Sequence, residues 1–102
     1  MSGNPNYPIS TAVVSWFDSA GQLHIRVYSS DGYTVTERCN DGNGWVTGQF
    51  AQPGKQVSAT CWNASDGTHI RVYCTIDDST TEWCGSGDGV DEGHLHPRLS
   101  DR

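Results

Sequence analysis

The pentapeptide His-Ile-Arg-Val-Tyr occurs twice in this chain, at His24–Tyr28 and again at His69–Tyr73, 45 residues later. A second motif keeps the same displacement, because Thr36-Glu37-Arg38-Cys39 recurs as Thr81-Glu82-Trp83-Cys84. Two separate motifs that recur at the same spacing of 45 residues, in a chain of 102 residues, indicate two copies of one structural unit.

Within each unit, apolar and polar residues alternate with period two and are interrupted by turn residues, which predicts β-strands. The expected strands are Ala12–Trp16, His24–Ser29, Tyr33–Cys39 and Trp45–Phe50 in the first unit, and Gln56–Trp62, His69–Cys74, Ser79–Cys84 and a weaker Val90–Leu95 in the second. Four strands at a period of about 45 residues are typical of a β-propeller blade. We therefore predict an all-β fold with two tandem four-stranded blades.

The predicted organisation has a flexible N-terminus at 1–8, one blade at 9–50, a second at 51–96 and a tail at 97–102, with Gln52-Pro53-Gly54 connecting the blades. A propeller ring has about four to eight blades, so two blades must be completed by further chains. Two, three or four chains would all close a ring. The alternative is an eight-stranded sandwich or barrel in a monomer.

Composition excludes several classes of function. There are 12 acidic against 6 basic side chains and a formal net charge of −6, which disfavours nucleic acid and anionic membranes as partners. No apolar run approaches the roughly 20 residues of a membrane span, and Met1–Tyr7 does not resemble a signal peptide. We expect a soluble protein without membrane insertion, located in the cytoplasm or released by a non-classical route.

The four cysteines contain no Cys-x-x-Cys pair, and Cys39 and Cys84 hold equivalent positions in different units. This pattern predicts reduced, structural cysteines and disfavours a zinc site. His94 and His96 alternate near the C-terminus, but no further ligand set stands beside them. Neither a metal nor a cofactor is expected.

An Arg and a Glu in each unit are the candidate binding residues. A two-residue turn at Asp31-Gly32 would place Arg26 opposite Glu37, and the 45-residue displacement would place Arg71 opposite Glu82. A cross-strand salt bridge explains one such pair, whereas its duplication favours a binding site. A guanidinium donates to vicinal sugar hydroxyls while the carboxylate accepts from a neighbouring one.

Sugar binding also needs an aromatic plate for the C–H face of the ring. Trp45 stands at a strand start after a Gly-rich loop and can serve as that plate or pack between blades. Trp16, Trp62 and Trp83 lie inside strands and are expected in the core. Glu37 and Glu82 each face an Arg in separate units, an arrangement unsuited to glycoside hydrolysis, so no enzymatic activity is expected.

The repeated His-Ile-Arg-Val-Tyr and Thr-Glu-x-Cys motifs, together with the strand before each, resemble the fucose-specific lectins of the Aleuria aurantia type. The resemblance covers residues 10–95 and is greatest to the short two-repeat bacterial members. The resemblance implies a six-bladed propeller made by a homotrimer. It also implies calcium-independent fucose sites between adjacent blades, each with Arg and Glu from one blade and aromatic residues from the next. Fucosylated glycans are then the expected partners.

The second unit departs from this family pattern. Where the family has aromatic residues, the first repeat has Asn40 and Trp45, but the second has Gly85 and Val90. The resemblance therefore implies an intrachain site of Arg26 and Glu37 without an aromatic plate, and an interchain site of Arg71 and Glu82 facing Trp45. The alternative function is a propeller scaffold that has lost sugar binding and serves as a structural or protein-interaction module.

Overall fold

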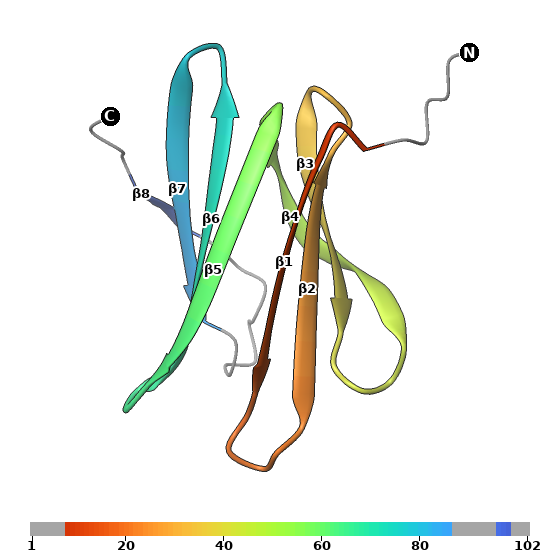
Figure 1. The fold of residues 1–102 in the computed structure, drawn as a ribbon, viewed down its shortest axis with the longest axis vertical. Helices are drawn as coiled ribbons and strands as arrows, with labels where there is room; N and C mark the ends of the chain where they lie inside the picture. Colours follow the sequence, from red (N-terminus) through yellow and green to blue (C-terminus); the bar gives the residue numbers. More distant parts are fainter. Residues whose placement is uncertain (1–7, 87–95, 99–102) are drawn as a thin grey trace.

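The computed structural model of the chain describes residues 8–86 and 96–98, and the secondary structure in these ranges consists of β-strands. The strands form two four-stranded antiparallel sheets, each with its strands in chain order (Figure 1). The first sheet contains β1 (Ser10–Phe17), β2 (Leu23–Ser30), β3 (Thr34–Asn40) and β4 (Trp45–Pro53); the second contains β5 (Gln56–Ala64), β6 (Gly67–Ile76), β7 (Ser79–Ser86) and β8 (His96–Arg98). Among the described residues, no helix is long and apolar enough to cross a membrane.

The all-β fold expected from the alternation is confirmed, and every predicted strand up to Cys84 overlaps an observed one. The expected strand Val90–Leu95 lies outside the described residues. The described fourth strand, β8, includes Pro97 and Arg98, which had been predicted to belong to the C-terminal tail. Pro97 is compatible with this strand because β8 is at the sheet edge, where a missing backbone N–H costs no ladder bond.

The turn between β2 and β3 is longer than the predicted two-residue turn at Asp31-Gly32. Ser30 pairs with Val35, so the chain reverses over residues 31–34. The Asp31 carboxylate accepts hydrogen bonds from the backbone N–H groups of Tyr33 and Thr34, both at 2.9 Å. This side-chain cap stabilises the wider turn at the expense of the tight one.

The longer turn corrects the predicted register by two residues. Glu37 lies opposite Tyr28, and Arg26 lies opposite Cys39. Arg26 and Glu37 are therefore diagonal neighbours instead of direct partners. Because side chains alternate with period two, a shift of two residues keeps both on the same face of the sheet.

The second sheet needs the same correction for a different reason. Its tight turn is Asp77–Asp78, one residue later than a turn that would place Arg71 opposite Glu82, and these two aspartates have φ of 54° and 66°. Two left-handed residues in succession suit the twist of a β-hairpin, and Asp tolerates that conformation better than Ile. As a result Glu82 lies opposite Tyr73, with Arg71 diagonal to it.

One face of the first sheet packs against one face of the second, and β1 and β5 lie side by side (Figure 1). Ser10 Oγ joins these strands by accepting from Val57 N at 3.0 Å and donating to Val57 O at 3.3 Å. At the linker, a side chain on Gly54 would collide with Val35 and Cys74, one from each sheet. The buried core comprises Val14, Trp16, Tyr28, Val35, Phe50, Val57, Ile70, Val72 and Cys74.

Equivalent positions of the two sheets differ in burial because each sheet has only one covered face. In the first sheet the covered face carries Arg26 and Trp16, and Trp16 is 5% exposed. In the second sheet the covered face carries Val72, so Arg71 and Trp62 lie on the open face and Trp62 is 43% exposed. The prediction that Trp62 is a core residue is therefore wrong for a single chain.

His24 ties together the two loops at one end of the first sheet. Its Nδ1 lies 2.6 Å from Asp41 Oδ1, and its Nε2 lies 2.8 Å from Asp18 Oδ2. A carboxylate only accepts hydrogen bonds, so both ring nitrogens must carry a proton and the ring is an imidazolium. Burial of the ring lowers the pKa of His24, but the hydrogen bonds to Asp18 and Asp41 outweigh the effect of burial. Together they raise the pKa of His24 above its usual 6.5.

We expect the protein to lose stability as the pH rises above 6.5, because folding raises the pKa of His24 and the folded protein gives up this proton only above the usual value. The pKa of His24 is higher in the folded protein than in the unfolded one. The stability that His24 contributes is therefore fully present below pH 6.5 and is lost as the pH rises through the pKa of the folded state. The urea midpoint of wild type should fall above pH 6.5 more than that of His24→Gln. Equal falls in the two proteins would contradict the assignment.

The four cysteines form no disulfide in the described part of the chain, as predicted; they are Cys39, Cys61, Cys74 and Cys84. Burial raises the pKa of Cys39 and of Cys74 to about 11, so both are protonated and unreactive at neutral pH. Thiol titration of protein unfolded without reductant should therefore count four groups. A count of two or fewer would reveal a disulfide.

Candidate functional site

Arg26 lies in the middle of β2, and its side chain is only 1% exposed. Its Nη1 donates to Asp41 Oδ1 at 2.8 Å and to the Ile25 carbonyl at 3.0 Å, while Nη2 lies 3.5 Å from Asp41 Oδ2. The guanidinium carbon is 5.2 Å from the centroid of the Trp16 ring. A carboxylate therefore pairs with one edge of this buried cation while an indole packs against its face.

Asp41 was not among the predicted site residues, although the sequence contains a signal for it. Glu37, Cys39 and Asp41 continue one period-two alternation past the end of β3, which ends at Asn40. The sequence predicts no strand at Asp41, because the residues that follow the strand belong to a Gly-rich loop. In the structure this carboxylate is the salt-bridge partner of Arg26, the role expected for Glu37.

Glu37 is equally buried, and its partner is a tyrosine. Tyr28 Oη donates to Glu37 Oε2 at 2.8 Å. Within the described residues, Glu37 Oε1 and Arg26 Nε are both buried without a hydrogen-bond partner. A side chain at Gly48 would overlap the Glu37 carboxylate, so a glycine is needed beside it. The carboxylate oxygen can only accept and the Nε–H group can only donate, so a water molecule or a hydroxyl group has the chemistry to pair with either atom.

Arg71 and Glu82 repeat this arrangement on the open face of the second sheet. Arg71 Nη1 donates to the Ile70 carbonyl at 3.0 Å, and Nε lies 3.9 Å from Glu82 Oε2. Tyr73 Oη donates to the same Glu82 oxygen at 2.8 Å. The Arg71 and Glu82 side chains are 16% and 22% exposed, so this pair remains in contact with solvent.

The two guanidinium groups differ in their carboxylate partners. The residue 45 positions after Asp41 is Ser86, which cannot supply a second carboxylate to Arg71. The Nη groups of Arg26 are held by a salt bridge, whereas the charge partner of Arg71 among the described residues is the more distant Glu82. Arg71 therefore keeps more of its donor capacity for an external acceptor.

The aromatic residue expected at the site does not meet either Arg within one chain. Trp45 begins β4 opposite Asn40, is 47% exposed and takes part in no ring contact among the described residues. On the side of the second sheet, Gly85 lies in β7 opposite Ile70, and Val90 is outside the described residues. The polar halves of both predicted sites are thus present, but among the described residues of one chain the predicted plate, Trp45, stands beside neither of them.

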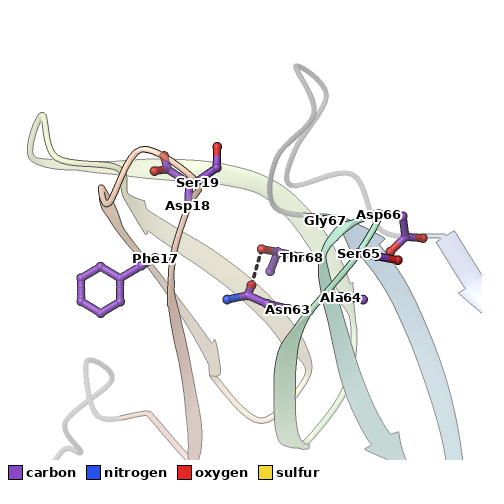
Figure 2. Close-up of a pocket in the computed structure, with 9 residues that line it drawn as sticks. All are labelled: Phe17, Asp18, Ser19, Asn63, Ala64, Ser65, Asp66, Gly67 and Thr68. Carbon is purple, nitrogen blue, oxygen red and sulfur yellow. Dashed lines mark hydrogen bonds between the residues drawn. The ribbon is translucent and has the colours of Figure 1, made fainter.

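A groove of about 560 Å³ lies away from these residues, between the β1–β2 and β5–β6 hairpins (Figure 2). Phe17, Asp18 and Ser19 line one side, and residues 63–68 line the other. Figure 2 shows the Phe17 ring pointing away from the second hairpin. None of the predicted sugar-binding residues lines this groove, so its size does not mark the candidate site.

The described residues contain no cluster of three or more His, Cys, Asp or Glu side chains able to hold a metal ion. The side chains of His94 and His96, which had been weighed as metal ligands, lie outside the described part. The described side chains of the candidate site are hydrogen-bond donors, hydrogen-bond acceptors and indole rings.

The resemblance noted from the repeated motifs is confirmed by comparison with known proteins. The model of the fungal fucose-specific lectin family matches residues 2–95. Among solved structures, the chain is similar to a fucose lectin from Kordia zhangzhouensis in complex with methyl-fucoside, with 32% sequence identity and a TM-score of 0.69. The alignment covers 90% of this chain and 65% of that one.

No curated protein matches the chain. The family match nevertheless spans strands β1 to β7 and all five residues of the predicted site, from Arg26 to Glu82. This protein belongs to the fungal fucose-specific lectin family.

Proposed function

We propose that this protein is a lectin that binds L-fucose and fucosylated glycans without transforming them chemically. The strongest support for sugar binding is that an Arg, a Glu and a Tyr share one face in each of the two sheets. The hydrogen bond from the tyrosine to the glutamate is 2.8 Å long in both. Family membership and the methyl-fucoside complex of the similar lectin support fucose as the sugar.

The open pair in the second sheet is the main proposed site. Arg71 donates through its guanidinium edge to vicinal sugar hydroxyls, and Glu82 accepts from a neighbouring one. Tyr73 occupies one Glu82 oxygen, which fixes the carboxylate and leaves the other oxygen for the ligand. Neutral sugars suit this site because the two charges balance each other.

The aromatic part of this site comes from another copy of the chain in our proposal. Polar contacts largely replace the hydrogen bonds of water and contribute about 1 kcal/mol each, so they hold a sugar weakly by themselves. An indole also removes the apolar C–H face of the sugar from water. Trp45 is exposed at the start of β4 and is available for this role.

The two sheets are, in this proposal, consecutive propeller blades of 9–50 and 51–96, extended by β8. Within one chain, the face with Arg26 packs on the face with Val72. The equivalents of these faces are the Arg71 face and the outer face of the first sheet, where Val13 is 58% exposed. If the Arg71 face of one chain packs on the outer face of the first sheet of the next chain, the contact repeats the packing within a chain. Successive chains then associate head to tail and close a ring.

We expect a homotrimer with six blades, the closed form that the resemblance to two-repeat lectins implies. Light scattering or sedimentation should give about 33 kDa, three times the 11.1 kDa of one chain. Val13→Asp should dissociate the trimer, because it places a charge in the proposed interface. Tyr33→Asp, an exposed change on a hairpin outside this face, is the control. A folded wild-type monomer at micromolar concentration would refute the ring.

We further expect one strong fucose site per chain, at Arg71 and Glu82 with Trp45 from the adjacent chain. Calorimetry should show that Arg71→Ala weakens binding at least about tenfold, since a charge-assisted hydrogen bond contributes about 1.5–3 kcal/mol. Trp45→Ala should have an effect of similar size. Arg26→Ala should change the affinity by less than about twofold, because its site faces Gly85 in place of an aromatic residue.

Two matched controls separate binding from general effects of charge or aromatic area. Lys55→Ala removes an exposed cation, and Tyr33→Ala removes an exposed aromatic ring; neither should change the affinity. Thermal unfolding must accompany Arg26→Ala, because that change leaves Asp41 without its salt bridge. Two equal sites per chain, or equal losses for Arg26→Ala and Arg71→Ala, would show that the aromatic partner is wrongly assigned.

A further inference from the structure

Each sheet contains the same three-residue stack beside its Arg–Glu pair. In the first, the rings of Trp16 and His24 stack at 5.3 Å and 15°, and the Arg26 guanidinium lies 5.2 Å from the indole centroid. In the second, Trp62 and His69 stack at 5.2 Å and 13°, and Arg71 lies 4.9 Å from the indole. Burial does not explain this agreement, because one stack is buried and the other is partly exposed.

Both histidines are also held by an aspartate from the preceding hairpin, although the two hairpins differ in length. Asp18 reaches His24 Nε2 at 2.8 Å from six residues upstream. Asp66 reaches His69 Nε2 at 2.7 Å from three residues upstream. The 45-residue displacement does not superpose these aspartates, yet the contact is the same, and Figure 2 shows both on the hairpins that border the groove.

In the first sheet the Asp–His unit has a direct connection to the guanidinium. Asp41 Oδ1 binds both His24 Nδ1 and Arg26 Nη1. In the second sheet Ser86, which has no carboxylate, stands at the position of Asp41. Among the described residues, the Trp62 indole contacts both His69 and Arg71 and so connects them.

We propose that His69, held by Asp66, is a positioning residue for the fucose site: it fixes the plane of the Trp62 indole, on which the Arg71 guanidinium rests. The sugar-binding part of this inference rests on the proposed function. His69 and Asp66 touch no ligand themselves and act through Trp62.

The physical reason is that the chain itself gives the Trp62 ring few neighbours. Within one chain Trp62 is 43% exposed, and its ring contacts among the described residues are with His69 and Arg71. In the proposed ring a neighbouring chain would cover this face, and the contacts with His69 and Arg71 would remain the restraints from within the blade. Stacking on an imidazole that is itself tethered leaves the indole less freedom. A fixed indole in turn limits the rotamers of Arg71, so less conformational entropy is lost when the guanidinium binds a ligand.

The test compares three variants with wild type. Titration with methyl-fucoside should show His69→Ala binding about fivefold to tenfold more weakly, because the stack loses one of its rings. His69→Phe keeps an aromatic ring and should recover most of the affinity. Asp66→Asn is expected to weaken binding about twofold to threefold by loosening the tether. Asp78→Asn changes an exposed aspartate in the opposite turn and is the control.

A second readout does not depend on the sugar. The Nε–H resonance of Arg71 should show greater mobility by NMR relaxation in His69→Ala than in wild type or His69→Phe. If wild type fails to bind methyl-fucoside, the proposed function is wrong, and this resonance alone decides the positioning role. Unchanged affinity together with unchanged mobility in His69→Ala overturns the inference. No recovery in His69→Phe, in a protein that melts like wild type, overturns it as well.

Discussion

The packing of one sheet face against the next decides the environment of every polar group at the candidate sites. Within a chain, the face of the first sheet is closed by the Val72 face of the second, which buries Arg26 and Glu37 almost completely. Among the described residues of one chain, the face with Arg71 has no such cover. The same local constellation is therefore a buried polar network in one sheet and a solvent-accessible one in the other.

Burying a cation requires compensating charge, and the first sheet supplies it. Arg26 and the His24 imidazolium face Asp41 and Asp18, so two positive charges meet two negative ones at the end of the sheet. In the second sheet Arg71 stays in contact with solvent and is stable without this arrangement. The difference between Asp41 and Ser86 accordingly follows the difference in burial between the two arginines.

Strand geometry alone builds the polar half of each site. Cross-strand pairing sets Trp beside His, and alternation puts Arg, Tyr and Glu on the same face, so these contacts recur at nearly the same distances in both sheets. The aromatic half is different, because Trp45 pairs with Asn40 and therefore lies on the opposite face of the first sheet from Arg26. A single chain carries all five predicted site residues, but its fold does not bring Trp45 into contact with either arginine.

The repeat, the strands and the common face of Arg and Glu were predictable from the sequence, because each follows from a period that local backbone geometry imposes. The register was not, since the Asp31 side chain stabilises a wider turn than the Asp-Gly pair suggests. Asp18 and Asp66 were also missed, because loops of unequal length carry them to equivalent histidines and only folding reveals the equivalence. Tertiary structure alone decided which Arg is buried, because burial depends on which of two chemically similar faces the neighbouring sheet covers, a contact between residues far apart in the chain.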